Sequence, residues 1–226
     1  MKMSDASGRL PLGIFGGTFD PVHNGHLRLA EEAADALRLD AVRWIPAGQP
    51  ALRERPQATP VQRLEMVRLA IAGNPRFELD AAEVEAAQPS YTVPTLERLR
   101  QSAFCGEQRP LVLLVGADAF AGMAGWHRWE RLFELAHIAV AHRPGFPVLA
   151  DSLPSALASQ FRLRTCADAA ALAQAPSGLI ASFAMTQLDI SATRIRSLLS
   201  KGHSARYLLP ETLLNYTRQH QLYSEK

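Results

Sequence analysis

The chain of 226 residues is poor in several features, and each shortage excludes a class of protein. Its two cysteines, Cys105 and Cys166, have no metal-ligand spacing and suggest no disulfide framework, so we expect a cytoplasmic protein. The 24 basic and 22 acidic side chains leave a formal net charge of +2, which argues against a dedicated nucleic-acid binder. No apolar run approaches the roughly 20 residues that cross a bilayer, so we expect no membrane partner.

Two common nucleotide-binding motifs are also missing. The Gly-Lys-Ser/Thr ending of a Walker loop occurs nowhere, and no Gly-x-Gly-x-x-Gly follows the first predicted strand. These absences disfavour P-loop NTPases and NAD-dependent dehydrogenases. The chain has no cluster of carboxylates either, so we expect no dedicated protein site for a metal ion.

Apolar runs and amphipathic segments alternate along the chain, which predicts an α/β fold. Residues 111–115, closed by Gly116, are typical of the central strand of a parallel sheet. We therefore expect a doubly wound, Rossmann-like parallel sheet with a small C-terminal helical part. Strands are predicted at 10–15, 41–46, 77–80, 111–115, 137–141 and 179–183, and helices at about 27–38, 60–73, 95–102, 155–161, 167–174, 192–201 and 210–220.

The same pattern predicts the domain organisation. We expect a flexible leader over residues 1–9 and one domain over 10–226, because 47% hydrophobic residues support a sizeable core. A long loop over 47–60 follows the second strand, at the edge where open α/β sheets bind ligands. Residues 144–178, rich in Pro, Ala and Ser, read as an insertion, and C-terminal helices follow at about 191–220.

A glycine turn near the N-terminus predicts a phosphate site. Gly16 and Gly17 end the first predicted strand, and a helix begins close to His23 and His26. Glycines let a phosphate approach the backbone, and free N–H groups at a helix N-terminus point at the anion. A spacing of three residues brings both histidines to one side, where each could donate a hydrogen bond to phosphate oxygens.

A second segment predicts another anion site. Ser191 is a good N-cap, and Ile190 and Ile195 are spaced for a hydrophobic staple. The hydroxyls of Ser191 and Thr193, with one or two arginines, would then surround an anion at the helix start. Taken alone, the segment would more often be an ordinary capped surface helix.

Both segments resemble the nucleotidyltransferase family. Residues 16–26 match its signature Gly-Gly-Thr-Phe-Asp-Pro-x-His-x-Gly-His, and residues 190–196 match its second motif, Ile-Ser-x-Thr-x-Ile-Arg, both without a departure. The resemblance implies transfer of an adenylyl or cytidylyl group from a nucleoside triphosphate, with release of pyrophosphate. It implies catalytic roles for Thr18, His23 and His26, and ATP contacts from Gly16, Gly17, Phe19, His23, His26, Ser191, Thr193 and Arg196.

Four further segments resemble the nicotinate-nucleotide adenylyltransferase subfamily: 89–92, 116–118, 125–129 and 142–144. The resemblance runs from about Leu12 to Tyr223 and weakens through the insertion. It implies that ATP and nicotinate mononucleotide give deamido-NAD, with Mg²⁺ carried mainly by phosphates and water. The implied acceptor contacts are Thr18, Arg53, Thr92, Val93, Asp118, Trp126, His127 and Arg143.

The residue chemistry suits this acceptor. A flat pyridine ring needs an aromatic platform, which Trp126 offers, and its carboxylate needs N–H donors such as those of turns at Thr92–Val93 and Trp126–His127. Asp118 is expected to accept from a ribose hydroxyl, to cap the helix after its strand, or both.

The chain departs from the subfamily pattern at three positions, where Leu52 replaces a loop histidine, Pro94 an aspartate and His127 an aromatic residue. Alternatives therefore stay open: nicotinamide mononucleotide or phosphopantetheine as acceptor, or a non-catalytic nucleotide-binding regulator. The oligomeric state is also open, a homodimer included.

Overall fold

The computed structural model describes residues 10–51, 55–86 and 88–224, and its centre is a parallel sheet. The order β4-β2-β1-β6-β7-β8 places the first strand in the middle, with the N-terminal half of the sheet on one side and the C-terminal half on the other. This is the doubly wound order of a Rossmann-like fold, so the predicted fold class is confirmed. The strands are β1 (Leu12–Gly17), β2 (Ala41–Pro46), β4 (Phe77–Leu79), β6 (Leu111–Gly116), β7 (His137–His142) and β8 (Ile180–Ala184).

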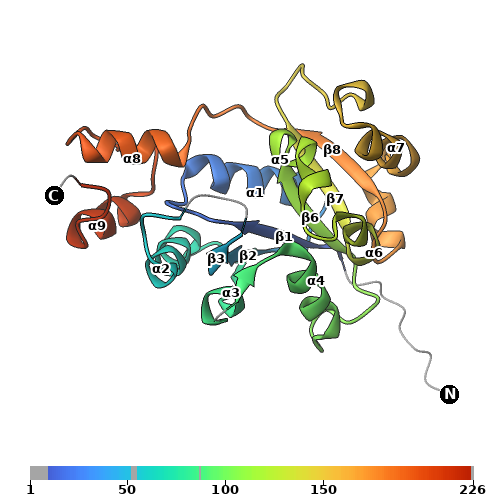
Figure 1. Ribbon diagram of the computed structural model, residues 1–226, viewed down its shortest axis with the longest axis horizontal. Helices are drawn as coiled ribbons and strands as arrows, with labels where there is room; N and C mark the ends of the chain where they lie inside the picture. The colour runs from blue at the N-terminus through green and yellow to red at the C-terminus, as the bar shows by residue number, and fades with distance from the viewer. Residues whose placement is uncertain (1–9, 52–54, 87, 225–226) are drawn as a thin grey trace.

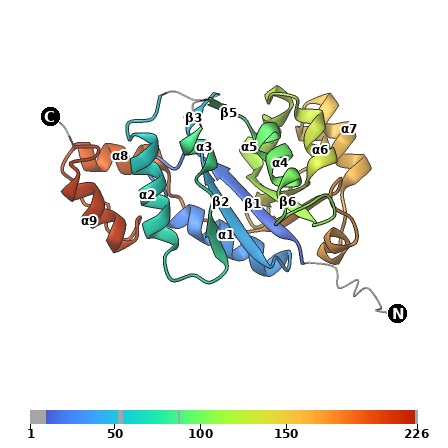
Figure 2. The same cartoon turned by 90° about the horizontal axis from the view of Figure 1, so that it is seen from below.

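Helices cover both faces of the sheet, with α1 and α4 on opposite sides (Figure 1). Alternate side chains of the strands feed two separate cores. Phe15 belongs to a core with buried residues of α1 (Asn24–Ala36), α2 (Pro60–Ile71), α8 (Ala192–Ser200) and α9 (Glu211–Gln219), while Leu12 and Ile14 belong to the core of the opposite layer. That opposite layer contains α4 (Thr92–Gln101), α5 (Ala117–Ala121), α6 (Leu132–Leu135) and α7 (Ser155–Arg164). Figure 2 shows α8 and α9 at one end of the molecule and α7 at the other.

The remaining elements are short. A two-residue strand in the predicted loop, β3 (Gln49–Pro50), pairs in parallel with β5 (Pro89–Ser90). The others are the helix α3 (Ala82–Glu85) and the 3₁₀ turns η1 (Met123–Gly125), η2 (Trp129–Arg131), η3 (Ala150–Ser152) and η4 (Ala169–Gln174). Among the described residues, no helix has both the length and the apolar character needed to cross a bilayer.

All six predicted strands of the main sheet are present; the bounds of β2 are as predicted, and those of the other strands differ by at most two residues. Helix α4 begins three residues before the predicted start, because Pro94 lies in its first turn, where a missing N–H costs no helical hydrogen bond. The helix predicted at 167–174 is the 3₁₀ segment η4. The leader predicted at residues 1–9 lies outside the described residues, and the division into leader and single domain stays a prediction.

Arg100, on α4, donates hydrogen bonds to the segments that precede three strands of the sheet. The Arg100 guanidinium donates to the carbonyl oxygens of Leu135 at 2.5 Å, Arg109 at 2.6 Å and Pro176 at 2.7 Å. It also reaches the carbonyls of Gly106 and Glu107. These residues precede β6, β7 and β8, so Arg100 organises the amino edge of the sheet.

We predict that Arg100→Ala lowers the free energy of unfolding by about 2–3 kcal/mol, because several carbonyls lose a charged donor in a half-buried site. Urea unfolding measures the change. Arg68→Ala is the matched control, since the Arg68 side chain is 59% exposed and pairs with the partly exposed Glu65, where an ion pair contributes about 1 kcal/mol or less. Equal losses in the two variants would contradict the assignment.

Candidate active site

The central strands separate at their carboxyl ends, and this point of separation is the expected ligand-binding crevice of such a fold. β1 stays paired with β2 as far as Gly17 and Pro46, but its pairing with β6 ends at Ile14 and Leu113. The chain leaves β1 toward one face of the sheet and leaves β6 toward the other. In open α/β sheets, such a point at the carboxyl ends of the strands is where ligands bind.

Glycines border the crevice on both strands. A Cβ built on Gly116 would meet no atom within 4 Å, and one on Gly16 would meet only the Ile45 carbonyl at 4.0 Å. Gly17 differs, because a Cβ there would lie 2.8 Å from the Phe19 ring. The packing of the protein therefore requires glycine at position 17, whereas Gly16 and Gly116 have room in front of their backbones for a ligand.

The two signature histidines meet at the start of α1, as their spacing predicts. His23 is the N-cap residue, and its ring stacks on that of His26 with 3.7 Å between centroids. The backbone N–H of His23 donates to His26 Nδ1 at 3.2 Å. Because Nδ1 accepts this bond, the proton of a neutral His26 ring is on Nε2, which can donate it to a phosphate oxygen.

His23 is a neutral group in the free protein. Its side chain is buried, and desolvation lowers its pKa from 6.5 to about 4. Within the described part of the chain its buried Nδ1 has no hydrogen-bond partner. A Cβ on Gly25 would lie 3.1 Å from the His23 ring, so Gly25 leaves the space that this ring occupies.

Phe19 packs against the His26 ring. It adopts a left-handed backbone conformation with φ of 51°, and its ring packs edge-on against His26 at 5.2 Å. The side chain is 3% exposed, so any contact of Phe19 with ATP would come from its backbone.

The start of α1 has fewer free N–H groups than the sequence predicts. The Asn24 N–H donates to the Leu208 carbonyl at 3.0 Å, and its side-chain amide donates to the Tyr207 carbonyl. The His26 N–H bonds back to the His23 carbonyl. In the described structure, Gly25 has the first-turn N–H that is left for a ligand.

The second motif lies against the first. Ser191 caps α8 by accepting from the Arg194 N–H at 3.2 Å, as predicted. Arg196 donates to the Asp20 carbonyl at 2.7 Å and to the Thr193 hydroxyl at 3.3 Å. Residues separated by more than 170 positions therefore meet at one edge of the sheet, and the hydroxyls of Ser191 and Thr193 are exposed beside them.

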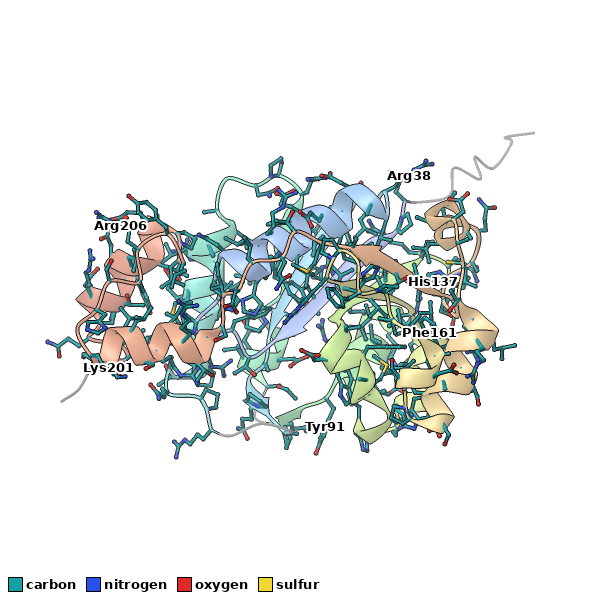
Figure 3. The ribbon with its side chains drawn as sticks, turned by 90° about the horizontal axis from the view of Figure 1, so that it is seen from above. Arg38, Tyr91, His137, Phe161, Lys201 and Arg206 are labelled. Atoms are coloured by element: carbon teal, nitrogen blue, oxygen red, sulfur yellow. The ribbon has the colours of Figure 1, made fainter. Side chains whose placement is uncertain are left out.

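Three of the residues expected to bind the acceptor, Thr92, Val93 and His127, lie at or near the start of α4. Its N-cap residue, Tyr91, makes no side-chain capping bond, and the Tyr91 ring lies 4.8 Å from the His127 ring. Tyr91 is on the opposite side of the molecule from Arg38, which precedes β2 (Figure 3). The predicted turn at Thr92–Val93 is thus the first turn of a helix, whose N–H groups point outward from its end.

The other predicted acceptor residues are distributed along the same edge. Trp126 is half-buried and follows η1, while Arg143 is exposed directly after β7. Val93 is 1% exposed, so it can contribute only its backbone. Asp118 is exposed in the first turn of α5, whose N-cap is Gly116, so the capping role considered for Asp118 is wrong. Arg53 and Leu52 lie outside the described residues.

Sequence reasoning missed two buried charged residues beneath the turn. Asp20 accepts from the Gln57 and Ala58 N–H groups and from the Tyr223 hydroxyl at 2.6 Å. Arg63 is fully buried on α2 and donates to four backbone carbonyls. The helical spacing of Arg63 with the buried Met66 and Val67 was a signal that could have identified it as an inward-facing residue.

The fold and this glycine-turn site define a nucleotidyltransferase, and residues 14–198 match the model of the cytidylyltransferase-like family. The chain is 64% identical over 213 residues to a protein of Dechloromonas aromatica named a nicotinate-nucleotide adenylyltransferase, covering 94% of this chain and 97% of the relative. A relative from Pseudomonas paraeruginosa with the same name is 46% identical and covers 94% and 96%. The chain belongs to the nicotinate-nucleotide adenylyltransferase family.

Solved structures share the fold. Plasmodium falciparum nicotinic acid mononucleotide adenylyltransferase complexed with NaAD superposes with a TM-score of 0.69 at 13% identity, covering 95% of this chain and 97% of that chain. The same protein complexed with APC gives a TM-score of 0.63 at 14% identity, with the same coverage.

We predict that protonation of His23 destabilises the fold. The unfolded chain binds this proton near pH 6.5 and the folded protein only near pH 4, so stability is full above pH 6.5 and falls as the pH drops toward 4. The loss is up to about 3 kcal/mol. His23→Gln should remove this part of the pH dependence of the unfolding free energy, whereas His203→Gln, at an exposed position, should not. Parallel pH profiles of wild type and His23→Gln would refute the prediction.

Proposed function

We propose that the protein catalyses the reaction for which its family is named, adenylyl transfer from ATP to nicotinate mononucleotide, in the cytoplasm and with residues 10–226 as one catalytic domain. The observation that carries the proposal is the meeting of two anion-binding motifs: the stacked pair His23 and His26, and α8 with Arg196 bonded to the Asp20 carbonyl at 2.7 Å. Both lie at the carboxyl edge of β1, next to the opening between β1 and β6.

The proposed mechanism is a direct in-line displacement. An oxygen of the acceptor's 5′-phosphate attacks the α-phosphorus of ATP, the bond from that phosphorus to the bridging oxygen breaks, and pyrophosphate leaves. The nucleophile is already an anion, so no general base is needed, and catalysis depends on positioning and on stabilising the charge of the transition state. Donors for that charge are His26 Nε2, the His23 ring and the Gly25 N–H, with the Thr18 backbone orienting the acceptor phosphate.

Contacts to the triphosphate and the acceptor come from two sides of the crevice. Gly16 and Gly17 let ATP approach β1, and Ser191, Thr193 and Arg196 hold its phosphates. On the other side, Trp126 and the pair Tyr91 and His127 enclose the pyridine ring, and the uncapped start of α4 receives its carboxylate. A pyridine carboxylate is favoured there over an amide, because a helix N-terminus attracts an anion.

Mg²⁺ enters this proposal as part of the substrate Mg-ATP. Among the described residues, no three His, Cys, Asp or Glu side chains form a group that could hold a metal ion. Asp20, the carboxylate within the signature, has both oxygens bonded to protein donors. In this proposal, a divalent ion is held mainly by the phosphates and water, and it would reduce their charge.

We predict that His26→Ala lowers kcat about 100- to 1000-fold without unfolding the protein, because a donor to the transition-state charge is lost. Steady-state pyrophosphate release from Mg-ATP and nicotinate mononucleotide measures the effect, with circular dichroism as the folding check. His203→Ala should behave as wild type. A folded His26→Ala protein with normal kcat would remove His26 from the mechanism.

The pocket around Trp126 generates a separate prediction. Trp126→Ala should raise the KM for nicotinate mononucleotide about three- to tenfold, because a stacking surface is lost, and leave the KM for ATP unchanged. Trp129→Ala is the matched control, since the Trp129 ring packs on Phe133 instead. Wild-type protein is assayed in parallel with nicotinate mononucleotide, nicotinamide mononucleotide and phosphopantetheine. Preference for either of the last two would discard the carboxylate pocket and leave the phosphate site in place.

A further inference from the structure

Arg63 is the most deeply buried charged residue of the described structure. Its side chain has no exposed surface, and its guanidinium donates to the carbonyl oxygens of Thr18 at 2.7 Å, Ala47 at 2.6 Å, Gly48 at 2.8 Å and Ala58 at 3.3 Å. A guanidinium is a planar fork with five donors, which suits several carbonyls at once. Because it is fully enclosed, Arg63 cannot touch a substrate.

The carbonyls that Arg63 joins belong to separate loops. Thr18 is in the turn between β1 and α1, next to the stacked histidines. Ala47 and Gly48 follow β2, and Ala58 precedes α2. Asp20 reinforces the same junction, because its carboxylate accepts from the Gln57 and Ala58 N–H groups. Burial lowers the pKa of Arg63, and the Asp20 charge partly offsets that lowering.

The loop after β2 also contacts Ser90 and α3. The Gly48 and Gln49 N–H groups donate to the Ser90 hydroxyl at 2.9 and 3.3 Å. A Cβ on Gly48 would lie 2.0 Å from the Glu83 carbonyl oxygen, so this backbone packs directly on α3. Ser90 is two residues before Thr92, where α4 begins. A continuous path therefore runs from the Thr18 turn through Arg63 and Gly48 to the start of α4.

We propose that Arg63 is a positioning residue for adenylyl transfer: it sets the placement of the phosphate-binding turn relative to the loop and helix that hold the acceptor. This inference rests on the proposed function, since it assigns the turn to ATP and the α4 side to the mononucleotide. Displacing two reacting groups by about 1 Å costs on the order of 100-fold in rate. The loss should therefore fall on kcat, with little change in the KM for ATP.

The chain contains its own matched control. Arg100 makes the same kind of bonds, from a half-buried guanidinium to backbone carbonyls, but at the amino edge of the sheet away from the crevice. Arg63→Lys and Arg100→Lys should both be less stable than wild type. Lysine has one small ammonium group in place of the fork and cannot reach all the carbonyls.

The test measures kcat and both KM values for the two lysine variants and for Arg63→Ala and Arg100→Ala, at a temperature where circular dichroism shows each protein folded. We expect kcat to fall at least tenfold in the Arg63 variants and to stay within twofold of wild type in the Arg100 variants. Millimolar guanidinium, far below denaturing concentrations, should restore part of the kcat of Arg63→Ala. Should Arg63→Ala fail to fold, Arg63→Lys and Arg63→Gln carry the same comparison.

Three results would overturn the inference: normal kcat in folded Arg63→Lys, a loss confined to the KM for ATP, or equal kcat losses in the Arg63 and Arg100 variants. The acceptor is first identified with wild-type protein, and the variants are then assayed with that acceptor. A different acceptor would thus refute the proposed function while the comparison of Arg63 with Arg100 is still decisive.

Discussion

The buried Asp20 carboxylate and the buried Arg63 guanidinium lie under the glycine turn. The geometry of the candidate active site depends on the hydrogen bonds that these two charged groups require. Leaving Asp20 or Arg63 without hydrogen bonds would cost several kcal/mol. Their partners are almost entirely backbone groups of distinct segments: the turn after β1, the loop after β2 and the residues before α2. The Tyr223 hydroxyl adds the C-terminal end of the described chain to this set. Satisfying two charges therefore fixes the relative placement of several loops.

In the proposed mechanism, the histidines above this junction act on phosphate without carrying a permanent charge. Burial keeps His23 neutral, and the bond from its own N–H to His26 Nδ1 selects the tautomer of His26. A neutral donor stabilises negative charge as it develops but does not hold pyrophosphate as a fixed cation would. Arg196 adds a permanent positive charge, yet its guanidinium is already bonded to the Asp20 carbonyl and the Thr193 hydroxyl. The proposed site thus combines oriented dipoles with the restrained Arg196 guanidinium, which suits a reaction whose product must leave.

Much of this could be predicted from the sequence, because the informative features were local. Glycines after an apolar run, two histidines three residues apart and Ser191 before a helix each define their own geometry. The failures involve partners distant in the chain. Nothing near Asn24 indicates that Leu208 occupies its N–H, and nothing near Asp20 indicates Tyr223. The strand pair β3 and β5 was missed for the same reason, since two-residue strands have no periodicity and form only through their long-range pairing.

Arg63 and Arg100 show how one kind of interaction serves different purposes at the two edges of a parallel sheet. Both fix chain segments by donating to several carbonyls, and both would contribute similarly to stability. At the amino edge, the segments that Arg100 joins lead into β6, β7 and β8 and lie away from the signature turn. At the carboxyl edge, the segments that Arg63 joins include the signature turn after β1 and the loop after β2, so in the proposed function the same bonds would also position the two substrates. In this proposal, the strand edge at which each arginine lies, rather than the chemistry of the arginine, decides whether its hydrogen bonds affect the reaction.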